Sequence, residues 1–213
     1  MTALACPACG APVAFRSAAP YAVCGHCQSL LVRNDVSLES LGHVAQVPED
    51  FSPLQLNTSG LFDKRRFTLI GRVRKTWAEG SWSEWCALFD DQTLGWLAEA
   101  QGDLVMTFER SVDAFAKTRS PDSFRRAAAG DVLPLEGRRF TISDVKQVTC
   151  TGAEGELAAG LPLDKTLKSI DLRGPDAQFA TIEVSATALQ LFMGRYVEFD
   201  ECRFTGLRKL EGW

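Results

Sequence analysis

The chain has 213 residues, of which 46% are hydrophobic, and a formal net charge of −4 at pH 7. This length fits one domain of moderate size, or a small module followed by a larger one. The acidic balance argues against broad electrostatic attraction to nucleic acid or to an anionic membrane. No apolar run approaches the ~20 residues needed to span a bilayer, and no secretory signal peptide is apparent. We therefore expect a soluble, cytoplasmic protein.

Two Cys-x-x-Cys motifs near the N-terminus predict a metal site. Cys6 and Cys9 form the first motif, Cys24 and Cys27 form the second, and 14 residues separate them. Zinc takes four ligands in a tetrahedron and binds thiolates well. Paired motifs at about this separation are typical of structural zinc sites. The sequence therefore predicts one structural zinc ion, held by these four cysteines in a zinc ribbon that spans residues 1–34.

The residues around the motifs fit this interpretation. Gly10 follows the first motif and suits a tight turn with an unusual backbone angle. His26 lies inside the second motif, and because four thiolates complete the coordination shell, we expect its side chain to face solvent. A closed four-thiolate site leaves no position for a reactive water, so the predicted zinc is structural. Cys86, Cys150 and Cys202 stand alone in the sequence, and we expect them to be small buried residues.

A linker and a β-rich domain are predicted after the ribbon. Residues 35–60 show no sustained period and contain two prolines, which indicates a linker. In the domain over 61–213, alternating apolar and polar residues predict an antiparallel meander, and helix signals are scarce. We expect a mainly β fold, either barrel-like or sandwich-like. The predicted strands cover residues 67–74, 84–89, 95–97, 104–108, 140–142, 167–172, 179–184 and 196–199.

Short sequence echoes suggest that the β-rich domain contains two related halves. The tripeptide Arg-Phe-Thr begins at Arg66, Arg139 and Arg203, each at an expected strand start. A Gly-Arg pair likewise recurs at Gly71 and Gly194. The corresponding halves would span residues 61–110 and 131–209. A short helix ending at residue 130 is predicted between them.

A tryptophan cluster is the second notable feature. Four of the five tryptophans lie between residues 77 and 96. Trp82 and Trp85 are an odd number of residues apart, so a regular strand would direct them to opposite faces. In one interpretation the rings fill a small β core. In the other, Trp82, Glu84, Trp85 and Trp96 form a surface that binds a protein partner, because tryptophan is frequent at binding hot spots.

Basic residues close to these rings keep a nucleic-acid alternative open. Aromatic rings interleaved with cations are typical of grooves that bind single-stranded nucleic acid. Several acidic residues in the same region, and the acidic chain as a whole, weigh against that function. The basic residues are Lys64, Arg65, Arg66, Arg72, Arg74 and Lys75.

No set of catalytic residues is apparent in the sequence. A nucleophilic cysteine needs a nearby base, but His26 belongs to a metal motif and His43 to the predicted linker. The glycine-rich segment over 152–156 lacks the lysine and the helix context of a phosphate-binding loop. We therefore expect no enzymatic activity.

The segment over 67–109 resembles a bacterial family known as domain of unknown function 4178 (DUF4178). Its motifs are Gly71-Arg72, the run from Gly80 to Trp85, the acidic pair Asp90-Asp91 and the run from Gly95 to Gly102. Later segments over 155–157, 171–174 and 194–199 are also similar to that family. The resemblance implies an accessory role in a membrane-linked or a stress- or polyamine-related bacterial system.

Together these observations favour a non-enzymatic, zinc-binding adaptor or accessory protein that binds a protein partner. One alternative is a nucleic-acid-binding regulator that uses the ribbon and the basic, aromatic strand region. The other is an accessory subunit of an enzyme that modifies polyamines or peptides.

Overall fold

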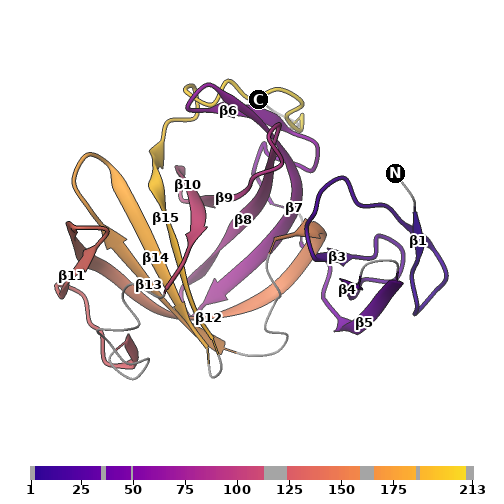
Figure 1. Ribbon diagram of the computed structural model, residues 1–213, viewed down its shortest axis with the longest axis horizontal. Helices are drawn as coiled ribbons and strands as arrows, with labels where there is room; N and C mark the ends of the chain where they lie inside the picture. The colour runs from indigo at the N-terminus through magenta and orange to yellow at the C-terminus, as the bar shows by residue number, and fades with distance from the viewer. Residues whose placement is uncertain are drawn as a thin grey trace.

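A computed structural model describes residues 3–34, 37–48, 50–112, 124–158, 166–185 and 188–209. Figure 1 shows a small N-terminal ribbon beside a larger domain of antiparallel strands. The ribbon strands are β1 (Leu4–Ala5), β2 (Pro12–Val13), β3 (Tyr21–Val23), β4 (Ser29–Asn34) and β5 (Ser37–His43). The larger domain contains β6 (Ser59–Phe62), β7 (Arg65–Trp77), β8 (Gly80–Phe89), β9 (Leu94–Ala100), β10 (Asp103–Arg110), β11 (Val132–Leu135), β12 (Arg138–Leu157), β13 (Thr166–Arg173), β14 (Gln178–Val184) and β15 (Leu189–Val197).

Eight strands of the larger domain close into a ring, here called the barrel. Hydrogen-bonded neighbours follow the order β12-β13-β14-β15-β10-β9-β8-β7, and β7 pairs with β12 to complete the ring. The short strands β6 and β11 pair with β7 and β12. A closed ring leaves no unpaired edge among its members. A ring of eight strands encloses an interior that side chains can fill or that can hold one small ligand.

The barrel consists of two segments with the same strand order. Strands β6 to β10 and strands β11 to β15 each form a hairpin that continues as a meander. The two segments meet at two seams, β7 against β12 and β10 against β15. The two segments span 59–110 and 132–197, and the division into related halves over 61–110 and 131–209 stays a prediction.

The opening hairpins of the two segments match in detail. Phe67 pairs with Gly60 in the first hairpin, and Phe140 pairs with Leu133 in the second, so both pairs are seven residues apart. Both turns use two consecutive residues with positive φ, which is the geometry of a tight hairpin turn. Two copies of Arg-Phe-Thr therefore occupy equivalent places. The third copy does not begin a strand, since Thr205 forms only an isolated bridge with Ser59.

Each seam contains a glycine against which the opposing backbone packs very closely. In the β7–β12 seam, Gly71 pairs with Gly155, and a Cβ atom on Gly71 would lie 1.8 Å from the carbonyl oxygen of Glu156. In the β10–β15 seam, a Cβ on Gly194 would lie 1.8 Å from the carbonyl oxygen of Met106. Only glycine fits so close to a backbone carbonyl without displacing it.

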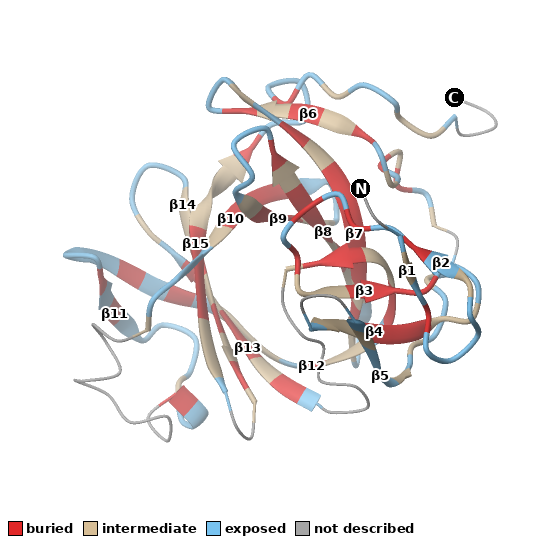
Figure 2. Ribbon diagram, turned by 45° about the vertical axis from the view of Figure 1, so that its right-hand side comes forward, coloured by how far each residue is buried: buried red, intermediate tan, exposed pale blue. Residues whose placement is uncertain are grey.

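Alternating residues on the barrel strands face its interior and its exterior. The exterior carries two apolar clusters. The first is centred on Trp85, Leu97 and Met106, and the second on Ile170 and Ile182. β6 and residues 202–207 cover the first cluster, whereas β11 and Phe124 cover the second. Figure 2 accordingly shows buried positions along the barrel strands and exposed residues in many of the connecting loops.

The ribbon is joined to the barrel by backbone pairing, apolar packing and one buried carboxylate. Strand β3 pairs with the last two residues of β12. Val23 and Leu30 of the ribbon pack in one cluster with Ile70 and Leu157 of the barrel. The carboxylate of Glu156 accepts hydrogen bonds from the backbone N–H groups of residues 16 and 17, at 2.8 and 3.1 Å. The ribbon and the barrel therefore share one continuous sheet.

Several local features differ from the sequence-based expectations. Strand β5 lies inside the predicted linker, because residues 37–43 extend the ribbon by pairing with β4. The glycine-rich segment over 152–156 is part of β12, and the last predicted strand occupies 189–197 rather than 196–199. Of the predicted short helix, residues 124 and 125 are helical and residues before 124 lie outside the described ranges. Within the described ranges, no helix has the length and apolar composition needed to cross a membrane.

Asp50 fastens the segment between the ribbon and the barrel to the barrel exterior. Its carboxylate pairs with Arg72, with Arg74 at 3.0 Å and with Arg208 at 3.1 Å. Burial opposes ionisation of Asp50, but the positive charges of Arg72 and Arg74 outweigh it and hold the pKa below its usual value of 3.8. Arg72 also lies over the ring of Trp85, 4.5 Å from its centroid. The ion cluster thus lies over Trp85 on this side of the exterior core.

Closure of the ring at Gly71 can be tested by adding one methyl group. We expect Gly71→Ala to lower the free energy of unfolding by about 3 kcal/mol or more, because the new Cβ must push the β12 backbone away. Gly25→Ala is the matched control, since no atom lies within 4 Å of a Cβ there and its φ is not left-handed. Urea denaturation of both variants gives the comparison, and equal stability of the two would contradict the described seam.

The Asp50 cluster predicts a pH-dependent loss of stability. Asp50→Asn should destabilise the protein by about 1–2 kcal/mol at pH 7, less than a fully enclosed ion pair would, because water reaches the site. A depressed pKa stabilises the folded state above the unfolded pKa, so the difference from wild type should be fully present above about pH 5 and should shrink progressively as the pH falls through the lowered pKa of the folded state. The exposed Asp91→Asn removes a surface pair with Arg65 but keeps the side-chain oxygen that accepts the N–H of Thr93, so it should leave the midpoint nearly unchanged. A difference for Asp50→Asn that does not shrink between about pH 5 and about pH 2 would contradict this explanation.

Candidate metal centre and barrel cavity

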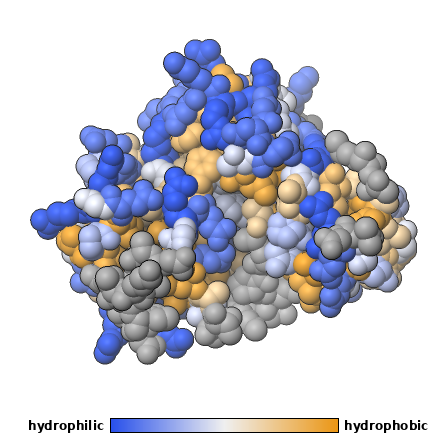
Figure 3. All heavy atoms as spheres, viewed as in Figure 1, coloured by the Kyte–Doolittle hydropathy of each residue, from blue (hydrophilic) through white to orange (hydrophobic). Residues whose placement is uncertain are grey.

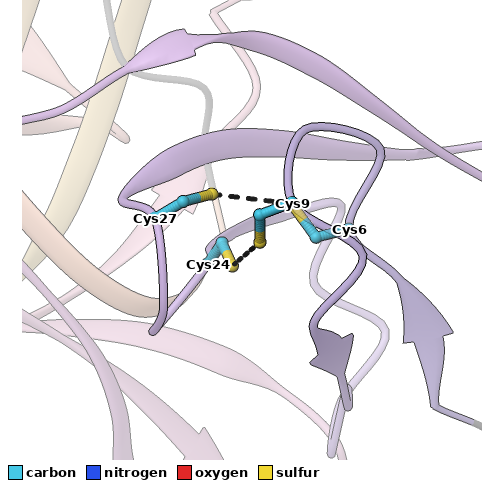
Figure 4. Close-up of side chains that lie close together, drawn as sticks. All are labelled: Cys6, Cys9, Cys24 and Cys27. Atoms are coloured by element: carbon cyan, nitrogen blue, oxygen red, sulfur yellow. Dashed lines mark hydrogen bonds between the residues drawn. The ribbon is translucent and has the colours of Figure 1, made fainter.

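The four N-terminal cysteines converge on one point of the ribbon. Figure 4 shows their side chains directed toward one another from two separate turns. All four Sγ atoms lie within 4.8 Å of one another; Cys6 and Cys27 are 3.7 Å apart, and Cys9 and Cys24 are 3.8 Å apart. A tetrahedron with metal–sulfur bonds of about 2.3 Å has sulfur–sulfur distances of about 3.8 Å. The geometry therefore suits one tetrahedral metal ion.

Two similar turns position these sulfurs. In the first, the N–H of Gly10 donates to the carbonyl of Cys6 at 2.8 Å, and in the second, the N–H of Gln28 donates to the carbonyl of Cys24 at 2.9 Å. The residue after each second cysteine has positive φ, +77° at Gly10 and +61° at Gln28. His26 is exposed and is not among the residues that converge on the site. Four sulfurs would complete the tetrahedral shell of a bound ion, which leaves no position for a substrate.

The barrel interior contains a cavity of about 210 Å³. Every one of the eight barrel strands contributes at least one residue to its lining, which places the cavity inside the ring. In the face of the molecule drawn in Figure 3, hydrophobic atoms gather near the centre and hydrophilic atoms occupy the upper edge. The lining includes Trp77, Trp82, Glu84, Trp96, Val105, Thr107, Lys146, Ser169, Asp171, Phe179, Thr181, Glu183, Phe192 and Tyr196.

The structure divides the predicted partner-binding residues between two sides of the barrel wall. Trp82, Glu84 and Trp96 line the interior cavity. Trp85 lies in the exterior core, fully buried, and its Nε1 donates to a carboxylate oxygen of Glu99 at 3.1 Å. Trp85 therefore belongs to a core, as the first interpretation predicts, whereas the other three line a cavity, and their binding of a partner stays a prediction.

A buried ion cluster spans the interior. Lys75 of β7 directs its amine to Glu84 of β8, 2.7 Å away, and to Glu183 of β14. Its side chain is only 6% exposed. Burial alone would lower the pKa of Lys75, but Glu183 and Glu84 outweigh burial and raise it well above the usual range. Lys75 therefore stays charged and links distant strands across the barrel.

The indole of Trp82 orients this cluster. Its Nε1 donates to Oε1 of Glu84 at 2.9 Å, while the other oxygen of Glu84 binds Lys75. The ring also packs against Trp77, with centroids 5.4 Å apart. Aromatic and charged groups of the lining are thus one connected network.

The sequence pattern did not identify the cavity residues of the second barrel segment. Asp171, Phe179, Glu183 and Tyr196 belong to it, and each is an ordinary strand residue in its own neighbourhood of the sequence. They approach Trp82 only because β15 pairs with β10 across the seam and β14 and β13 follow β15 around the ring. The only sequence signal for these cavity residues was the alternation of polar residues along the strands of this segment.

The basic residues considered for nucleic-acid binding make contacts within the protein. Arg72 and Arg74 pair with Asp50, Lys75 pairs with two carboxylates, and Arg65 pairs with Asp91 at 2.7 Å. Arg72 and Lys75 are buried. These four cations therefore have carboxylate partners already.

The thiols outside the metal centre are protonated. Burial raises the pKa of Cys86 and of Cys150 to about 12, and that of Cys202 to about 11. His43 lies in the ribbon, where its Nε2 is 3.5 Å from the hydroxyl oxygen of Ser29. This places His43 beside the metal centre rather than beside any of the three thiols.

The metal centre predicts one metal ion per chain. Elemental analysis of protein purified under reducing conditions should find about one equivalent. Cys24→Ser should abolish stoichiometric binding, because the thiolate at a buried corner of the tetrahedron is lost. His26→Ala, in the same turn, should retain the full equivalent. A wild-type protein without bound metal, or a loss in His26→Ala, would contradict the four-cysteine assignment.

Comparison with family models identifies the larger domain. The model described as Domain of unknown function (DUF4178) matches residues 55–199, which include β6 to β15. Comparisons with curated proteins and with solved structures gave no significant match. The match covers the complete barrel and more than half of the chain. The chain therefore belongs to the DUF4178 family.

Proposed function

We propose that the protein is a non-enzymatic accessory protein that recognises its partner molecule through the barrel cavity. The observation that carries this proposal is the convergence of side chains from all eight barrel strands on one cavity. Three of the four residues first considered for partner binding, Trp82, Glu84 and Trp96, lie in its wall. The recognised group is either a free small molecule or a side chain that a protein partner inserts.

The lining has the composition of a recognition site. Ligand pockets combine apolar and aromatic walls with a few placed polar groups. Here tryptophan, phenylalanine and tyrosine rings surround a connected set of carboxylates and amines. At about 210 Å³ the cavity is smaller than the roughly 300–1,000 Å³ of sites for drug-sized ligands. It suits a small molecule or one side chain, and it is too small for a nucleotide strand.

The metal is assigned as a single structural zinc ion. Four thiolates in a tetrahedron favour zinc over magnesium or calcium, which prefer oxygen ligands. Zinc-bound and free thiols persist in a reducing compartment, which supports a cytoplasmic location. The ion would stabilise the ribbon, whose apolar core is small.

The chemistry of the cavity favours binding over catalysis. The amine of Lys75 is held charged between two carboxylates, so it is a poor nucleophile. Cys150 carries a protonated thiol at neutral pH, because burial raises its pKa to about 12. Neither histidine contributes to the lining. These features support a non-enzymatic role.

A cavity-blocking substitution tests the proposal. A chemically diverse set of small amines, carboxylates and neutral compounds is screened by thermal denaturation, with tryptophan fluorescence as a second readout. At 100 times its Kd, a ligand stabilises by about 2.7 kcal/mol, which should raise Tm by about 5–10 °C. Ala98→Phe places a ring in the cavity wall and should abolish the shift.

The matched control is Ala129→Phe, which adds the same ring at an exposed position outside the lining. It should respond to ligands as the wild type does. Shifts that survive in Ala98→Phe, or the absence of any compound that stabilises the wild type, would contradict the cavity as the recognition site.

A further inference from the structure

The barrel interior already binds one alkylammonium group, which belongs to the chain itself. The side-chain amine of Lys75 sits between Glu84 and Glu183 and is nearly excluded from solvent. Trp82 supports the arrangement by donating a hydrogen bond to Glu84. Carboxylates and indole rings of this lining can therefore replace the water shell of an ammonium ion.

Acidic groups in the cavity outnumber its cations. Four carboxylates line the cavity, the exposed Asp103 and the more enclosed Glu84, Asp171 and Glu183, and Lys75 compensates Glu84 and Glu183. The remaining amine of the lining, Lys146, binds Asp144, which lies outside the lining. The interior therefore retains a carboxylate that no amine neutralises directly.

Asp171 is that carboxylate. Among the described residues no lysine or arginine forms an ion pair with it; the charges of Lys146 and Lys75 act on it from farther away, and its hydrogen-bonding neighbours are hydroxyl groups. The Oγ of Ser169 lies 3.5 Å from its Oδ1, and Thr181 also contributes a hydroxyl. Burial raises the pKa of Asp171, because the enclosed surroundings disfavour its charged form. A bound cation would remove that penalty.

Aromatic rings lie on two sides of the same cavity. Trp77 of β7 and Trp82 of β8 are in tilted contact, with centroids 5.4 Å apart, and Phe179 of β14 meets Tyr196 of β15 edge to face at 5.6 Å. The faces of such rings attract cations. Two of them already do so here, since the amine of Lys146 lies 5.2 Å from the Trp77 centroid and the guanidinium of Arg173 lies 5.2 Å from that of Tyr196.

We propose that the cavity binds a small organic cation through its ammonium group, with Asp171 as the counter-ion and the surrounding tryptophan and tyrosine rings as its walls. This inference rests on the proposed function, because it assumes that the cavity is the recognition site. The same chemistry fits a free alkylamine and a lysine side chain of a protein partner. An anion is disfavoured, since it would enter a cavity lined by four carboxylates.

Matched probes of one size separate charge from shape. Isothermal titration calorimetry compares n-pentylammonium with 1-pentanol and with pentanoate, which differ in charge at nearly constant volume. We expect the ammonium probe to bind at least tenfold more tightly than the alcohol, and pentanoate not to bind. Equal or tighter binding of the alcohol or the carboxylate would overturn the proposal, even where the cavity itself proves to be the recognition site.

Asp171→Asn tests the assigned counter-ion, since it removes the charge and keeps the shape. It should weaken pentylammonium binding at least tenfold and leave pentanol binding unchanged. Asp91→Asn, at an exposed turn far from the lining, should bind as wild type does. Unchanged binding of pentylammonium by Asp171→Asn would overturn the assignment of the counter-ion. If this variant fails to fold, the order of the affinities of the three probes for the wild-type protein still decides the ligand class.

The source of the ammonium group is distinguished with one more probe. Nα-acetyl-lysine methylamide carries the lysine side chain together with a peptide backbone. Binding comparable to that of pentylammonium would indicate that a protein partner can supply the group. Binding of the free amine alone would assign the cavity to a small molecule, whereas a failure of both ammonium probes would overturn the inference.

Discussion

The close approach of two backbones at Gly71 and Gly155 determines most of this architecture. At that point β7 and β12 come together so tightly that the carbonyl oxygen of Glu156 occupies the place of a side chain. Without this pairing the eight strands would form an open sheet with two free edges. Closure converts the inner face of that sheet into the wall of a cavity. It also directs the last residues of β12 toward β3 of the ribbon.

Strand β12 therefore couples the metal centre to the barrel. Its 20 residues pair with β11 and β13 at the start, with β7 in the middle and with β3 at the end. Glu156 of β12 is 95% buried and ties down the loop that connects the two cysteine motifs. The ribbon, whose apolar core is small, is thus held by the barrel, and a metal ion bound by the four cysteines would stabilise it further. We therefore expect a change at the metal centre to alter the stability of the β7–β12 seam, because β12 pairs both with the ribbon and with β7.

The four-cysteine site was predictable from the sequence, whereas the cavity was not. Local turns bring the cysteines together, but the cavity residues meet only through pairings between distant parts of the chain. Four cysteines within 22 residues encode their own convergence through two local turns. The cavity depends on pairings such as Gly71 with Gly155, far apart along the chain. Bulges near Ile70 and Thr151 also shift the alternation of inward and outward residues. Strand periodicity could therefore predict the strands and place Trp82 and Trp85 on opposite faces, but it could not say which face would become an interior.

The polar interior makes sense as a compromise between stability and recognition. A buried Lys75 with two carboxylates gains little stability over an apolar filling of the same volume. The exterior of the same strands shows that this chain readily builds tightly packed apolar clusters. An interior selected for stability alone would resemble them. Instead it keeps charged groups, stacked rings and empty space together, which is the pattern expected where a fold gives up some stability to hold a polar site in place.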